Sequence, residues 1–315
     1  MEKSNFFPPP VHGIAASKHV IQVSSPQTVI HYLSEKFPAI PLASWQSRCQ
    51  LGKIFDNRGS TLSGNEPCVA GTTIYYYREI PDEPVIPFQE KIIAETEHLL
   101  VVDKPHFLPT IPGGNYVQQT LLTRLRQSTG NYQLVPLHRL DKDTAGLVLL
   151  CKTPDKRESY SQLFRNRSIH KQYLAIAAKP PSHTEPFTYR SRLVKGEPFY
   201  RMQEISGPAN AETRISPLRP VLSPFDDQLQ WLYQLEPVTG QQHQLRVHMA
   251  ALGIPILNDP LYPELKPYAD ATTAPLPDYS EPLQLLASTL KFIDPENGEH
   301  LFFKSSRQLD YLEFD

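Results

Sequence analysis

No stretch of this chain restricts its possible folds as much as residues 136–151, which read PLHRLDKDTAGLVLLC. A turn rich in charged side chains, 138–143, leads there into an aliphatic run, 147–150. Short aliphatic runs bounded by turn residues are typical of buried strands. A carboxylate just ahead of such a strand, here Asp141, stands at the edge of a core, and Gly146 lets another backbone or a ligand approach closely. By spacing alone an ordinary surface turn is the other interpretation, because Asp, Lys and Thr are common in turns.

Length and composition indicate an ordinary globular protein. The 315 residues suffice for one large domain and a small one, and 40% hydrophobic with 20% charged residues is a usual balance. No apolar run approaches the roughly 18 residues of a membrane span, and no signal-peptide pattern opens the sequence, so we expect no membrane partner. Cys49, Cys68 and Cys151 lack metal or redox spacing, which favours a reducing cytoplasm and no bound metal.

The charge is unevenly distributed. A net charge of −2 argues against a uniformly basic surface for nucleic acid. Residues 152–179 nevertheless hold seven Lys or Arg against two acidic residues. A solvated helix face would produce this local excess, and so would a restricted patch that binds phosphates.

The order of patterns predicts two folded parts. In the first part, Val29, Leu33 and Phe37 recur every four residues, as in a helix. Residues 45–56 are expected to form a second helix that runs into a strand, and residues 71–77 a further strand. The expected boundaries are a Pro-rich tail at 1–20, a small α/β module at 21–80, an extended linker at 81–87 and a large domain at 88–315.

In the large domain, apolar patterns predict strands at 98–104, 147–150, 168–177 and 228–235, and the apolar segment 283–292 is expected to complete the core. Helices are expected at 117–127, after Thr153, and from Thr239, where Gln242 completes a capping-box pattern. Hairpins and loops broken by prolines are expected over 180–227, and a Pro- and Ala-rich loop over 267–282.

Several of these segments resemble one enzyme family. HRLDKDTAGLVLL at 138–150 is similar to the signature HRLD-x-x-[TS]-[SA]-GL of the RluA-type pseudouridine synthases. LLVVDKP at 99–105, KQYLA at 171–175 and TGQQHQLRVHMAALGIPILNDPLYP at 239–263 are similar to further segments of that family. The resemblance implies an α+β pseudouridine synthase fold, with a mixed, mainly antiparallel central sheet flanked by helices and loops. It also implies isomerisation of uridine in structured ribosomal or transfer RNA by a monomer, without a cofactor.

The resemblance further implies three catalytic residues. Asp141 takes the place of the nucleophile, and Arg246 pairs with it, which favours the ionised carboxylate. Tyr173 would stack on the flipped uracil, a contact worth roughly 1–3 kcal/mol. Without the resemblance, Tyr173 would read as an aromatic residue at the core edge and Arg246 as a solvent-facing helix charge.

The matched motifs also supply the expected substrate-binding residues. Arg139 would occupy the space that the flipped base leaves, or hold a neighbouring phosphate. The other residues expected at the substrate are Lys104, His138, Lys171, His243 and Gln244.

Four positions depart from the family pattern. Gln241 and Gln242 stand where the family has Arg-Thr, which removes a cation near the pocket. Asn258 replaces a Gly and Leu286 a His. The small module is similar to the S-four-type RNA-binding module, but only Arg48, Lys53 and Arg58 offer its basic surface.

Two other classes of function compete with an RNA-modifying enzyme. A catalytically silent RNA-binding or ribosome-assembly protein on the same fold would be expected to lack Asp141, Arg246 or Tyr173, and all three are present. An aspartyl-phosphate phosphotransferase would place its D-x-D motif after a strand, whereas here the strand follows. A zinc pair of His243 and His248 is disfavoured because residues five apart share a helix face poorly.

Overall fold

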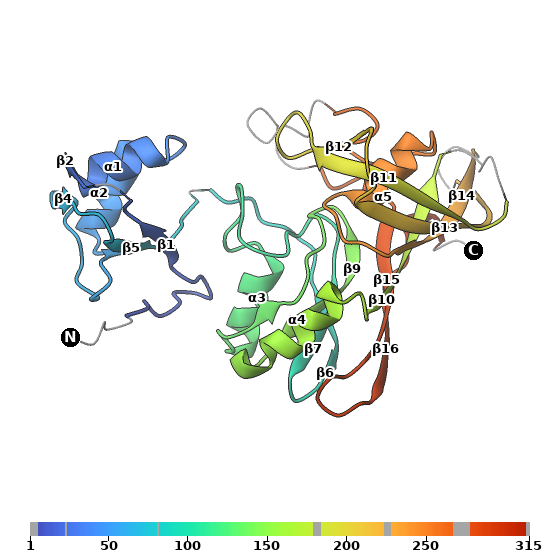
Figure 1. The fold of residues 1–315 in the computed structure, drawn as a ribbon, viewed down its shortest axis with the longest axis horizontal. Helices are drawn as coiled ribbons and strands as arrows, with labels where there is room; N and C mark the ends of the chain where they lie inside the picture. Colours follow the sequence, from blue (N-terminus) through green and yellow to red (C-terminus); the bar gives the residue numbers. More distant parts are fainter. Residues whose placement is uncertain are drawn as a thin grey trace. The chain divides into compact units, whose positions relative to one another are not determined.

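The fold is that of a computed structural model (Figure 1), which describes residues 6–22, 24–80, 82–178, 184–223, 228–266 and 278–312. The chain divides into two compact units. The smaller comprises Met1–Glu83 with Arg126–Tyr132, and the larger comprises Pro84–Leu125 with Gln133–Asp315. Within the described residues, no helix is long and apolar enough to cross a membrane.

The smaller unit packs two helices against short antiparallel strands. Its elements are β1 (Ser17–Val20), β2 (Ser25–Thr28), α1 (Val29–Lys36), α2 (Leu42–Gln50), β3 (Ile54–Phe55), β4 (Pro67–Cys68) and β5 (Thr73–Tyr76). β5 lies between β1 and β3, and β2 pairs with β4. Because 17–20 form β1, they belong to the folded unit and not to the tail expected at 1–20.

The three basic residues expected to offer an RNA-binding surface contact other groups of this unit. Arg48 is only 6% exposed, its guanidinium lies 4.8 Å from the Trp45 ring centroid, and it donates a hydrogen bond to the Glu79 carbonyl. Lys53 pairs with Glu79, and Arg58 with Asp56. RNA binding by this unit stays a prediction, and Arg48 is too buried to contribute to it.

The larger unit is built on one long mixed sheet. The strand order is β12-β11-β13-β14-β10-β15-β9-β7-β6, and β16 pairs with β15 and β8 with β9. Among the described strands only the β9–β15 pair is parallel, so the predicted mainly antiparallel sheet is confirmed. The strands are β6 (Lys91–Glu95), β7 (Leu99–Lys104), β8 (Val135–Pro136), β9 (Ala145–Cys151), β10 (His170–Ala177), β11 (Phe187–Lys195), β12 (Met202–Ile205), β13 (Ala211–Leu222), β14 (Leu229–Pro237), β15 (Leu285–Ile293) and β16 (His300–Lys304).

Helices cover the sheet around β7 and β9. α3 (Leu121–Thr129) contributes Leu121 and Leu125 to a core cluster with alternate residues of both strands, such as Val148. α4 (Arg157–Arg165) follows a short 3-10 turn at Pro154–Lys156. It contributes Tyr160 to a second core cluster, which contains the residues of β7 and β9 that alternate with those of the first cluster. Strands buried on both faces read as continuous aliphatic runs. That is why 147–150 carries no polar residue.

Gly146 allows β9 and β15 to pair. Its φ of +110° lies in a region that side chains other than Gly rarely adopt. A Cβ there would lie 2.3 Å from the Ala287 carbonyl oxygen. The close backbone approach expected at this glycine is therefore confirmed, and the partner is β15.

Two helix starts differ from expectation. α5 (Gln244–Ala251) begins five residues after Thr239, and its N-cap is His243 with φ +53° and no side-chain cap. The capping box was wrong, because Thr239 Oγ1 instead donates to Gln244 Oε1 at 2.6 Å. α3 begins at Leu121 and not at 117, since Thr123 Oγ1 donates back to the Val117 carbonyl at 2.7 Å. Of the loop expected at 267–282, residues 267–277 lie outside the described part.

Candidate active site

Asp141 stands in the turn between β8 and β9, where its backbone is held on both sides. Its carbonyl accepts a hydrogen bond from the Thr144 amide at 3.2 Å. The preceding Leu140 exchanges two hydrogen bonds with Thr110 Oγ1, at 2.8 and 3.2 Å. The Asp141 side chain keeps 29% of its surface exposed. The carboxylate is thus fixed by rigid backbone yet open to a ligand.

Arg246 on α5 lies against this carboxylate. Its Nη1 is 3.4 Å from Asp141 Oδ2, while Nε and Nη2 donate to the two oxygens of Asp259 at 2.8 and 2.6 Å. Both Arg246 and Asp259 are 1% exposed at the side chain. Burial acts to lower the pKa of Arg246, but the charge and hydrogen bonds of Asp259, followed by Asp141, raise it above the usual value. The guanidinium therefore stays charged beside Asp141.

His243 approaches the other oxygen of the same carboxylate. Its Nε2 lies 3.8 Å from Asp141 Oδ1, and its Nδ1 lies 2.9 Å from the Tyr262 hydroxyl. That hydroxyl accepts a hydrogen bond from the Met202 amide at 2.7 Å, so we assign its own proton to the bond with Nδ1. Burial lowers the pKa of His243, which favours the neutral ring. In this tautomer the Nε2–H group faces Asp141.

Tyr173 on β10 completes the group. The ring is partly buried and packs against two core clusters at once, one on each side of the strand. Burial first, and then the negative charge of Asp141, raise the pKa of its hydroxyl. The structure thus brings Asp141, Arg246 and Tyr173 together from three different elements.

Comparison with known proteins identifies the fold and the family. Residues 98–251 match the family model described as RNA pseudouridylate synthase. An uncharacterised RNA pseudouridine synthase of Synechocystis is 32% identical over 240 residues, which cover 74% of this chain and 79% of that protein. The chain belongs to the RNA pseudouridylate synthase family. It is accordingly an isomerase, as its resemblance to the RluA-type enzymes implied.

Two further comparisons agree. The ribosomal large subunit pseudouridine synthase D of Nitrosomonas europaea is 30% identical over 221 residues, covering 68% of this chain and 61% of the relative. The solved structure of human RNA pseudouridylate synthase domain containing 1 superposes with a TM-score of 0.56 at 23% identity, covering 71% of this chain and 86% of that one. The second comparison supports the predicted fold alone.

Lys104 was expected at the substrate but lies under the turn that carries Asp141. Its side chain is fully buried, and Nζ donates to the carbonyls of Pro105, Leu108 and Lys142 at 3.0, 2.7 and 3.0 Å. Burial lowers its pKa to about 7, against the opposing charges of Asp143 and Asp141. Lys104 therefore shapes the turn that carries Asp141.

His138 and Gln244 are likewise engaged by the protein. His138 Nε2 accepts the Leu149 amide at 3.1 Å, and its ring stacks on Phe164 at 4.9 Å between centroids. Gln244 is 4% exposed and its amide bonds to the Thr239 and Thr213 hydroxyls. The ring of His138 and the amide of Gln244 thus bond to other groups of the protein, and their contact with substrate stays a prediction.

Arg139 and Lys171 remain available to a ligand. Arg139 is exposed, and within the described residues its side chain forms no hydrogen bond or ion pair. The Lys171 ammonium lies near Gly240, 3.9 Å from the position that a Cβ would take there, and burial lowers its pKa. Binding of substrate by these two residues stays a prediction.

Sequence reasoning missed Asp259 and Tyr262. Asp259 holds Arg246, and Tyr262 orients His243 while its ring lies 5.5 Å from the Arg246 guanidinium. Both lie in the segment NDPLYP, which the family comparison already covered. A buried Arg requires a carboxylate partner, and this requirement points to Asp259. Within the described residues, no cluster of His, Cys, Asp and Glu could hold a metal ion.

Proposed function

We propose that this synthase converts a flipped-out uridine in RNA to pseudouridine with Asp141 as nucleophile. The reaction breaks the glycosidic bond between carbon 1′ and nitrogen 1 and forms a bond from carbon 1′ to carbon 5 of the same base. The proton leaving carbon 5 is balanced by one gained at nitrogen 1. Nothing is oxidised or reduced, so the residues of the chain can carry the whole isomerisation.

The observation that carries this proposal is the fixed pair of Asp141 and Arg246. A nucleophile must be ionised and correctly aimed before substrate arrives. The fully buried guanidinium of Arg246, held by Asp259, lies against one oxygen of the Asp141 carboxylate, and the other oxygen of that carboxylate faces His243. Exposure of the Asp141 side chain at 29% supports access by the flipped nucleotide.

The roles of the other residues follow from their chemistry. Because the pKa of the Tyr173 hydroxyl is raised, this phenol is a poor base at neutral pH, and we assign its ring to stacking on the uracil. Arg139 and Lys171 bind the flanking phosphates of the RNA. A substrate in ribosomal or transfer RNA is supported by the names of relatives, one for the large ribosomal subunit and one from yeast for transfer RNA position 31.

The test uses RNA tritiated at carbon 5 of uridine, both ribosomal and transfer, incubated with purified protein. We expect tritium release by the wild type and none by Asp141→Asn, which keeps the shape of the side chain without its charge. Asp155→Asn, on the exposed turn before α4, is the matched control and should release tritium normally.

The competing function is that of a silent RNA-binding protein. RNA retained by the wild type without any tritium release would favour it and reject the proposed isomerisation. Release that persists in Asp141→Asn would reject the assignment of the nucleophile and leave the activity standing.

A further inference from the structure

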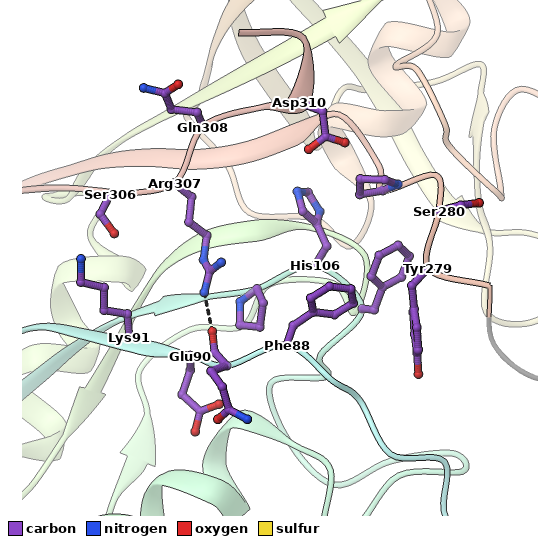
Figure 2. Close-up of a pocket in the computed structure, with 14 residues that line it drawn as sticks. Phe88, Glu90, Lys91, His106, Tyr279, Ser280, Ser306, Arg307, Gln308 and Asp310 are labelled. Carbon is purple, nitrogen blue, oxygen red and sulfur yellow. Dashed lines mark hydrogen bonds between the residues drawn. The ribbon is translucent and has the colours of Figure 1, made fainter. Parts of the chain in front are cut away.

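A second hollow of the larger unit, of about 720 Å³, is not used by the proposed chemistry (Figure 2). Its walls come from segments 88–91 and 105–107 and from the C-terminal segments 279–282 and 306–310. Sites for small organic ligands have volumes of about 300–1,000 Å³ and combine aromatic walls with a few polar groups. We call this hollow the accessory pocket.

One side of the accessory pocket is aromatic. The rings of Phe88 and Phe107 stack with 5.8 Å between centroids and 29° between planes. Tyr279 packs edge-on against Phe88 at 5.4 Å and meets Phe107 at 5.1 Å. All three rings are partly exposed, so the group offers ring surface to a ligand. A planar base is the natural partner, because every nucleobase stacks on aromatic rings.

The opposite side of the accessory pocket carries cations. Figure 2 shows Lys91 and Arg307 across the hollow from Phe88 and Tyr279. Arg307 is held by donating Nη2 to the carbonyls of Gln89 and Asp103, at 2.7 and 3.2 Å. Lys91 is exposed and forms no ion pair within the part of the chain that the structure describes. This separation of rings from cations matches a nucleotide, which separates its base from its phosphate.

The two carboxylates on the pocket wall are bound to protein groups. Glu90 pairs with Arg124 at 3.2 Å, and Asp310 accepts a hydrogen bond from the Gln284 amide at 3.1 Å. Their charges are thus partly offset within the protein. Lys91 is left as the cation best placed for a phosphate.

One residue of the pocket wall is hydrogen-bonded to the turn that carries Asp141. His106 Nδ1 donates to the Asp143 carbonyl at 2.7 Å, two residues after the proposed nucleophile. Its ring is neutral, since burial lowers its pKa to about 4, so Nε2 remains a hydrogen-bond acceptor. The next residue, Phe107, has φ +65°, which is unusual for a bulky side chain and is a conformation that surrounding structure must enforce.

We propose that the accessory pocket binds an unpaired nucleotide of the RNA substrate, separate from the uridine at Asp141. The inference rests on the proposed function. The base stacks on Phe107 and Tyr279 and offers an N–H group to His106 Nε2. The phosphate is bound by Lys91, while Arg307 is paired with the buried carboxylate of Asp103 at 3.6 Å. Recognition of this second nucleotide selects RNA whose loop presents two unpaired bases.

Photo-crosslinking tests the location. The probe is a short oligouridine containing 4-thiouridine, bound to the full chain, irradiated and mapped by mass spectrometry. Crosslinks are expected on Phe88, Phe107 or Tyr279, in the wild type and equally in Asp141→Asn. Crosslinks confined to other residues would overturn the proposal.

Affinity for the same oligouridine tests the energetics. Tyr279→Leu should weaken binding at least about fivefold, the low end for one lost base stack, while Tyr279→Phe retains affinity. Lys91→Gln should reduce the slope of log affinity against log salt by about 0.7. The matched controls are Phe302→Leu and Lys304→Gln on β16, outside the pocket.

The outcomes separate the two proposals. Equal affinity of Tyr279→Leu and Phe302→Leu, with tritium release intact, overturns the accessory pocket alone. Absence of tritium release with crosslinks and affinity losses as expected overturns the isomerisation and keeps the pocket. Thermal unfolding of each variant identifies any that fails to fold. If Tyr279→Leu fails, the salt slope of Lys91→Gln decides, and a slope equal to that of Lys304→Gln overturns the accessory pocket.

Discussion

Arg246 and Asp259 form a bidentate ion pair in which neither side chain is more than 1% exposed. Asp259 also accepts the amides of Leu261 and Tyr262, at 2.8 and 3.1 Å, so its carboxylate is fully engaged. The third guanidinium nitrogen is left for Asp141. The proposed nucleophile is therefore positioned by a residue two contacts away.

Asp259→Ala should destabilise the fold by about 3–5 kcal/mol, because it leaves a buried guanidinium without its counter-charge. Urea denaturation measures the loss. Glu158→Ala, which breaks the exposed pair with Arg165, should leave the unfolding midpoint unchanged. If both variants unfold at the wild-type midpoint, Asp259 does not compensate Arg246.

Tyr262→Phe should slow single-turnover isomerisation about 2- to 12-fold, since one hydrogen bond worth about 0.5–1.5 kcal/mol no longer fixes the His243 tautomer. RNA affinity should change little. Tyr189→Phe serves as control, because its hydroxyl bonds only to Glu204 on the surface. If Tyr262→Phe reacts at the same rate as the control, the orientation of His243 by Tyr262 does not contribute to the reaction.

Gly146→Ala should cost more stability than Gly253→Ala. Both glycines have positive φ, which costs another residue about 1–3 kcal/mol, but only at Gly146 would a Cβ meet backbone, at 2.3 Å. A Cβ on Gly253 has nothing within 4 Å. The comparison is made by thermal unfolding, and equal losses would show that β15 can shift away from β9.

Stability should fall as pH falls from about 6.5 toward about 4, in part through His138. Burial, and next the charge of Lys171, lower its folded-state pKa to about 3, below the ordinary 6.5. Between these values the unfolded chain binds the proton and the folded chain does not, so stability rises with pH, by up to about 1.4 kcal/mol per pH unit.

His138→Gln keeps an acceptor for the Leu149 amide but cannot titrate. Urea denaturation at several pH values should give this variant a shallower dependence than the wild type. Parallel curves would mean that His138 is protonated equally in both states.

The sequence predicted the strands well and the polar loops poorly. The aliphatic run of β9 and the alternation in β10 are local patterns that burial enforces, and both strands lie where expected. The capping box at Thr239 failed for a physical reason. Thr239 and Gln244 are drawn together across the turn, and Gln244 is held by Thr213 of β13, a contact that sequence spacing does not reveal.

Only those residues of the site that belong to a family motif could be predicted from the sequence. Asp141, Arg246 and Tyr173 meet because three elements distant in sequence share one sheet and one helix end. Lys104 and His138 have residue types typical of ligand binding, yet backbone groups occupy both side chains. Some polar side chains bond to other groups of the protein and are not free to bind a ligand. Tertiary contacts decide which ones, and composition and spacing do not encode those contacts.

The position of β15 in the sheet has a consequence for synthesis of the chain. β15 inserts between β10 and β9, although both are translated more than a hundred residues earlier. Until it leaves the ribosome, two long hydrophobic strands have open edges, which are prone to pair with other chains. Premature termination before residue 285 would thus yield an aggregating fragment, and the nascent protein stays inert until β15 has been translated.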